Sequence, residues 1–121
     1  MTAARRMAVV IRDAAKILKS CGYGVVHVGS PAISRYVPVD LVGIRGEHEI
    51  LHVKLKISIR TFPDDAATGV FCADECRQFR KMMTVDPGEF EPHFEVWVSL
   101  PSGGFCRIEV LPDTRKGGVH G

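Results

Sequence analysis

The chain has 121 residues, a formal net charge of +2 and a hydrophobic share of 45%. This size and composition fit one globular domain and exclude a disordered chain or a fibrous repeat. No stretch approaches the roughly 18–20 apolar residues of a membrane span, and charges interrupt the apolar N-terminal segment, which excludes a secretory signal. We therefore expect a single domain over residues 1–121, in the cytoplasm and away from the membrane.

Charge is divided unevenly along the chain. Residues 1–60 carry ten Lys and Arg against four Asp and Glu, whereas residues 61–121 carry six against ten. A basic half in a small domain indicates an anionic partner such as nucleic acid. The alternative interpretation is an uneven scatter of solvated charges.

The first predicted elements in chain order are a helix and three strands. Apolar residues recur at helical spacing over residues 3–20, and Gly22 follows as a stop signal. The run YGVVHVGS (23–30) predicts a strand, and PAISRY (31–36) predicts a loop. Two further strands are predicted over residues 37–44 and 48–60, with Gly46 in the hairpin turn between them.

Strict alternation marks the predicted third strand. One face carries only apolar side chains: Leu51, Val53, Leu55, Ile57 and Ile59. The other face carries only polar ones: His52, Lys54, Lys56, Ser58 and Arg60. This pattern is typical of a strand that buries one face against a core.

The second half of the chain predicts one helix and two strands. Residues 61–69 are predicted as a break, and residues 72–83 as a helix whose apolar side holds Cys72, Cys76, Phe79 and Met83. Strands are predicted over residues 93–100 and 104–111, with a frayed tail over 112–121. The helix is long enough for a parallel crossover. The expected fold class is α/β: a mixed sheet of about five strands, in the order α-β-β-β-α-β-β, with helices packed on it.

Four cysteines are present without any C-x-x-C pair: Cys21, Cys72, Cys76 and Cys106. Zinc sites space their ligands more tightly or pair them with a histidine couple. We expect buried free thiols and no disulfide in a reducing compartment.

The order of elements, with Asp40 on the second strand and Lys54 on the third, resembles the PD-(D/E)xK nuclease superfamily. Within it, the chain is similar to the archaeal-type Holliday-junction resolvases. AAKILKSCGYGVVHV resembles their first helix and strand, VDLVGIRGEHEILHVKLK their catalytic hairpin, and GFCRIEV their last strand. The resemblance implies a restriction-endonuclease-like fold, a homodimer, and binding to DNA, including branched DNA.

The resemblance also implies a metal-dependent catalytic site. Asp40 corresponds to the metal-binding aspartate and Lys54 to the catalytic lysine, residue types that hold Mg²⁺ and stabilise charge on a scissile phosphate. His52 stands where the family has the acid of its ExK motif, so HVK replaces EVK. Imidazole is an acceptable Mn²⁺ ligand but suits Mg²⁺ poorly. The implied catalytic residues are Asp40, His52 and Lys54, and the implied ligands of Mg²⁺ or Mn²⁺ are Asp40 and His52.

The family's first-helix glutamate has no counterpart either, because the one acidic residue over 3–20 is Asp13, which is offset from the expected position. We therefore expect a nucleic-acid-binding protein of resolvase type with weakened or lost phosphodiester cleavage. One alternative is an active metal-dependent endonuclease with a rearranged site. Another is a non-catalytic structural or partner-binding protein that retains only the fold.

Nucleic-acid contacts are expected from Arg35, Lys56 and Arg60. The expected homodimer contact is the region of Phe79, Met82 and Met83. Two registers of the hairpin stay open, because an odd loop centred on Gly46 pairs Asp40 with His52, whereas a two-residue loop pairs it with Val53. A simpler interpretation treats Asp40 as a strand-entry residue and the row of cations as a solvated sheet face.

Overall fold

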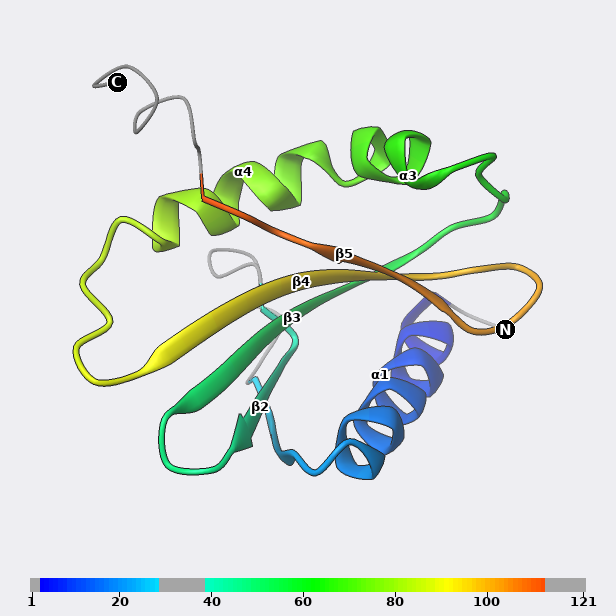
Figure 1. Ribbon diagram of the computed structural model, residues 1–121. Coiled ribbons are helices and arrows are strands. Elements are labelled where there is room, and N and C mark those ends of the chain that lie inside the picture. The colour runs from blue at the N-terminus through cyan, green and yellow to red at the C-terminus, as the bar shows by residue number, and fades with distance from the viewer. Residues whose placement is uncertain (1–2, 29–38, 113–121) are drawn as a thin grey trace, which may run out of the picture.

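A five-stranded mixed sheet separates two layers of helix in the computed structural model, which describes residues 3–28 and 39–112 (Figure 1). The elements in chain order are α1 (Ala3–Ser20), β1 (Gly24–His27), β2 (Leu41–Arg45), β3 (Glu49–Ile57), α3 (Asp65–Phe71), α4 (Ala73–Met82), β4 (Glu91–Ser99) and β5 (Phe105–Glu109). The strand order is β1-β2-β3-β4-β5. Only β3 and β4 are parallel, and the other neighbours are antiparallel. The expected α/β class with five strands is confirmed.

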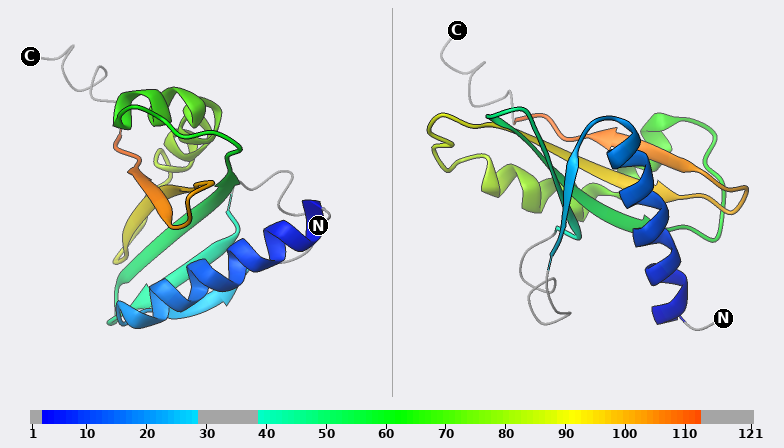
Figure 2. Two further views of the ribbon diagram at one scale, coloured as in Figure 1. Left: turned by 90° about the vertical axis from the view of Figure 1, so that its right-hand side faces the viewer. Right: turned by 90° about the horizontal axis from the view of Figure 1, so that it is seen from below.

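Each face of the sheet has its own core, and Figure 2 shows α1 on one side with α3 and α4 on the other. On one face, Val10, Ala14 and Leu18 of α1 pack against the buried side chains of β3. On the other face, Phe79 of α4 packs with every second side chain of β4. In the part of the chain that the structure describes, no helix combines the length and apolar character that a bilayer span requires.

Helix α1 ends where the sequence predicts. Gly22 has a φ of +91°, which favours glycine, and the Tyr23 N–H donates to the Leu18 carbonyl at 3.1 Å. This backbone arrangement closes the last helical turn and directs the chain into β1. Cys21 is exposed and Cys106 is half-buried, so the expectation of four buried thiols is confirmed for Cys72 and Cys76 alone. Cys21 lies in the turn that follows α1, beyond the last residue of the helix.

The hairpin between β2 and β3 has a register that neither sequence alternative describes. Arg45 pairs with Glu49, so a three-residue loop centred on Glu47 connects the strands. Gly46 supplies a φ of +65° at the start of this loop. Leu41 pairs with Val53, and Asp40 lies one residue beyond, beside Lys54. The loop is odd in length, so Asp40 shares the polar face of β3, but its neighbour is Lys54 and not His52.

Strand β3 is shorter than its alternation suggests. Leu51, Val53 and Leu55 are buried as expected, but Ile59 is 87% exposed and Ser58 is buried. The Ser58 hydroxyl donates to the Arg60 carbonyl at 2.6 Å and accepts from the Arg60 N–H at 3.1 Å. This local ring competes with strand pairing and turns the chain off the sheet after Ile57.

Two helices, and not one, connect β3 to β4. The segment over 61–69 was predicted as a break, yet α3 begins at Asp65 within it. The Asp64 carboxylate caps this helix by accepting from the Ala67 N–H at 2.8 Å. Helix α4 follows and buries Cys76 and Phe79, as the spacing of its apolar residues predicts.

Candidate functional site

Asp40 and Lys54 form an ion pair on the face of the sheet opposite α1. The Lys54 Nζ lies 3.3 Å from the Asp40 Oδ2, and both side chains are mostly shielded, at 22% and 13% exposed. The same Oδ2 accepts from the Leu55 N–H at 2.7 Å. The carboxylate therefore supplies a hydrogen-bond partner to β3 where the regular pairing with β2 ends. The structure thus brings together the two residues that the sequence pairs by resemblance.

His52 is held against β4. Its ring stacks on Phe94, with centroids 4.5 Å apart and planes 10° apart. Its Nδ1 lies 3.1 Å from the His93 carbonyl oxygen. A carbonyl oxygen only accepts, so Nδ1 carries the proton and Nε2 of the neutral ring is left as an acceptor. Burial lowers the pKa of His52, and this effect is larger than the increase that the His93 carbonyl causes. The lowered pKa favours the neutral ring.

The side chains around Asp40 do not fit a Mg²⁺ site. Mg²⁺ prefers several oxygen ligands in octahedral geometry. Over residues 3–28 and 39–112, no group of three or more His, Cys, Asp or Glu side chains gathers in a position to hold a metal ion. Lys54, which is cationic, already occupies the carboxylate of Asp40.

The cations expected to contact nucleic acid differ in their availability. The Lys56 Nζ donates to the Phe71 carbonyl at 2.9 Å and pairs with Glu75 at 3.2 Å, so it joins β3 to the helical layer. Arg60 is exposed, with its guanidinium 5.6 Å from the Phe62 ring. Arg35 lies outside the described residues. Sequence spacing alone gave no sign of the Glu75 partner, because it comes from a helix 19 residues further along the chain.

The described cations of the N-terminal half lie on two sides of the sheet. Arg12, Lys16 and Lys19 are exposed on α1. Helix α1 covers the face of the sheet opposite to Lys54 and Lys56 (Figure 2). The positive charge of the described part of residues 1–60 is therefore divided between these two sides.

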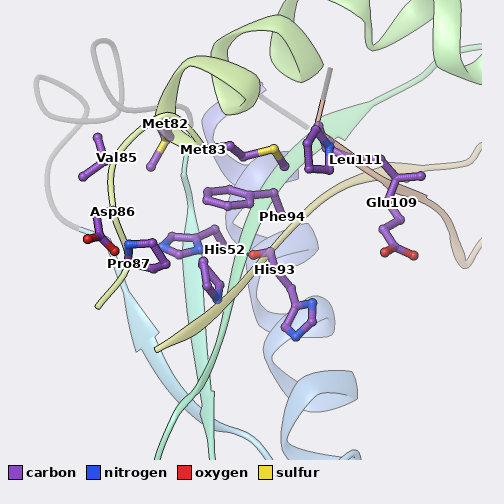
Figure 3. A pocket seen from close by; sticks show the side chains of 13 residues that line it. His52, Met82, Met83, Val85, Asp86, Pro87, His93, Phe94, Glu109 and Leu111 are labelled. Atoms are coloured by element: carbon purple, nitrogen blue, oxygen red, sulfur yellow. Dashed lines mark hydrogen bonds between the residues drawn. The ribbon is translucent and has the colours of Figure 1, made fainter. Parts of the chain in front are cut away.

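A cavity of about 520 Å³ opens beside His52. Figure 3 shows the Phe94 ring stacked over the His52 ring, with Met83 next to Phe94 and Asp86 on the loop that follows α4. The other apolar residues that line the cavity include Met82, Val85 and Leu111. Sequence reasoning assigned the two methionines to core or dimer packing and so missed the cavity. The available signal was the run Met82-Met83-Thr84-Val85, which carries more apolar side chains than a helix end needs.

A second, basic groove of about 720 Å³ lies next to the cavity, and the two share Met83, Glu109 and Pro112 as walls. Three cations of α4 line the groove: Arg77, Arg80 and Lys81. Arg77 pairs with Asp74 at 2.7 Å, and the Arg80 Nε donates to the Leu111 carbonyl at 3.1 Å. The arrangement presents positive charge close to an apolar cavity.

The arrangement of strands and helices is that of a restriction-endonuclease-like fold. A solved structure with this arrangement is Hjc, a Holliday junction resolvase from the archaeal hyperthermophile Archaeoglobus fulgidus, with a TM-score of 0.54 and 16% sequence identity. The match covers 84% of this chain and 73% of that chain. No protein-family model and no curated protein matches the sequence. The likeness therefore establishes the fold.

Proposed function

We propose that this domain binds nucleic acid, as a protein of resolvase type, and has lost metal-dependent phosphodiester cleavage. The observation that carries the proposal is the state of the catalytic hairpin. Asp40 and Lys54 stand together at the motif positions, while His52, in place of the motif's acid, packs on Phe94. The fold shared with the archaeal resolvase supports the binding part of the proposal.

Electrostatics explain why cleavage is lost. A dication bound at Asp40 must displace Lys54 or share the carboxylate with it, and among the described residues no group of three or more His, Cys, Asp or Glu side chains is placed to hold the metal. Mg²⁺ with one carboxylate keeps most of its water and binds weakly. Binding to phosphates needs no such cluster, because separate cations such as Arg60 and the α4 cations are enough.

The test is a binding and cleavage assay on linear and four-way-junction DNA of equal length, with Mg²⁺ and with Mn²⁺. The wild type should bind both DNAs, and its affinity should fall with salt at a slope of about −0.9 per phosphate neutralised. It should not cleave with Mg²⁺. His52→Glu restores the ExK pattern and should bind metal more tightly than the wild type, as calorimetry without DNA would show.

The matched controls are Asp40→Ala and Lys54→Ala. Mg²⁺-dependent cleavage by the wild type that both variants abolish would overturn the proposal and establish an active endonuclease. Absence of DNA binding at low salt, in the wild type and in His52→Glu alike, would favour a partner-binding protein that shares only the fold.

A further inference from the structure

The cavity beside His52 has a chemistry that excludes phosphate but accepts a flat, uncharged group. Its charged lining residues are Asp86 and Glu109, and neither lysine nor arginine contributes to its walls. The remaining lining is dominated by methionine, proline and aliphatic side chains around the Phe94 ring. Methionine sulfur makes favourable contacts with aromatic rings. The volume of about 520 Å³ lies within the roughly 300–1,000 Å³ of small-molecule sites.

Two polar side chains of the cavity lining, His52 and Asp86, present acceptor atoms. The neutral ring of His52 leaves Nε2 without its proton, because Nδ1 donates to the His93 carbonyl. Asp86 uses Oδ1 to accept from the Gly88 N–H at 2.9 Å, which fixes the carboxylate in its loop. A ligand that carries an amino group on a flat ring complements both acceptors. The amino groups of cytosine, adenine and guanine have this character, whereas thymine has none.

The neighbouring groove supplies the charge that the cavity lacks. Arg80 and Lys81 are exposed there, on the far side of Met83 from the cavity. Arginine and lysine side chains are the usual partners of backbone phosphates. An apolar cavity with acceptors and an adjoining cationic groove therefore match the two halves of a nucleotide.

We infer that these adjoining sites hold an unpaired nucleotide of single-stranded nucleic acid, with its base in the cavity and its backbone phosphate in the groove. The inference rests on the proposed nucleic-acid binding and specifies which structure the domain recognises. Val85 is 69% exposed and Leu111 is 57% exposed at the rim of the cavity. A base inserted between them covers apolar surface that water otherwise meets. Inside a duplex this contact is closed off, because the base is stacked and paired.

The test blocks the cavity at its rim. Val85→Trp places a large ring at the mouth of the cavity, and Val70→Trp is the matched control on α3, where Val70 is 78% exposed and lines neither the cavity nor the groove. The probe is a labelled oligo(dC) strand of about 12 nucleotides, within the range that single-strand-binding domains cover. Fluorescence anisotropy should show about 5- to 150-fold weaker binding by Val85→Trp, the range that corresponds to loss of one base–aromatic contact. Val70→Trp should bind like the wild type.

The base itself is tested with two further strands. A strand of the same length made of abasic sites keeps the phosphates and should bind as weakly to the wild type as oligo(dC) binds to Val85→Trp. Oligo(dT) lacks the amino group and should bind the wild type about 5-fold or more weaker than oligo(dC). His52→Phe keeps the stacked ring but removes Nε2, so it should narrow this difference.

Binding to duplex DNA distinguishes failure of the nucleotide site from failure of the proposed function. Salt-dependent duplex binding by the wild type, together with equal affinity for oligo(dC) and the abasic strand, would overturn the nucleotide site and leave the proposed function standing. Equal losses in Val85→Trp and Val70→Trp would also overturn the site. Absence of binding to every strand and to duplex would overturn the proposed function itself.

Discussion

The carboxylate of Asp40 stabilises strand β3, a role that its position in a nuclease-like motif does not indicate. One oxygen, Oδ2, receives both the Leu55 N–H at 2.7 Å and the Lys54 ammonium at 3.3 Å. Its side chain is 13% exposed, so water replaces these contacts poorly. These contacts give Asp40 a structural role at this motif position, because its carboxylate supplies the partner that the Leu55 N–H lacks beyond the end of β2.

Replacing Asp40 with alanine should lower the free energy of unfolding by about 1–3 kcal/mol, because the Leu55 N–H loses its partner and Lys54 loses its counter-charge. Urea titration of the wild type and the variant measures this difference. Asp13→Ala is the matched control, since Asp13 is 51% exposed and lies 3.8 Å from Arg12. It should change stability by less than about 0.5 kcal/mol. Equal effects of the two substitutions would contradict the structural role of Asp40.

Helix α3 shows how local sequence can hide an element. The segment over 61–69 contains a proline, two aspartates and a glycine, which together are typical of a loop. Yet Asp64 serves as the N-cap, and Thr68 is buried beneath the helix. The Phe71 carbonyl at the end of α3 accepts from Lys56. Packing against the sheet therefore outweighs the weak helix propensity of the segment.

Gly69 and Gly43 should respond to alanine in opposite directions. Gly69 lies inside α3, and a Cβ at this position meets nothing within 4 Å, so Gly69→Ala should stabilise the domain by about 0.5–1 kcal/mol. A Cβ at Gly43 lies 2.9 Å from the Tyr23 ring, so Gly43→Ala should destabilise it. Thermal unfolding followed by circular dichroism measures both. Destabilisation by Gly69→Ala would show that α3 is not helical in solution.

At the scale of the whole molecule, the two helical layers divide both the charge and the apolar surface. The basic residues of α1 and the cations of β3 lie on opposite sides of the sheet. The face of β1 and β2 away from α1 leaves Val26 at 51% and Ile44 at 45% exposed. Phe79, expected at a dimer contact, is fully buried and unavailable to a partner chain.

The resemblance to resolvases implies a homodimer, and we propose that it forms through side chains other than the buried Phe79. Exposed Val26 and Ile44 lie on neighbouring strands and form an apolar surface that a second copy would cover. Sedimentation velocity at micromolar concentrations should show a dimer for the wild type and a shift towards monomer for Ile44→Lys. Val70→Lys is the matched control and should leave the dimer intact. A monomeric wild type would contradict the proposed assembly.

The sequence by itself determined the features that depend on neighbours along the chain. Alternation from Leu51 to Leu55 predicted which face of β3 is buried, and the periodicity from Val10 to Leu18 predicted the face of α1. Gly22 and Gly46 marked turns because their positive φ angles favour glycine. These signals are local, so they can be identified without knowledge of the rest of the fold.

Only the tertiary structure decided the features that depend on residues far apart in the chain. The three-residue loop set Asp40 beside Lys54, and Glu75 of α4 reached back to Lys56. The parallel pairing of β3 with β4 placed Phe94 opposite His52, next to the cavity. The same pairing brought the His93 carbonyl to Nδ1 of His52, which set the tautomer of that ring. Residue spacing does not encode strand register or helix docking, because both follow from the packing of two cores on one sheet.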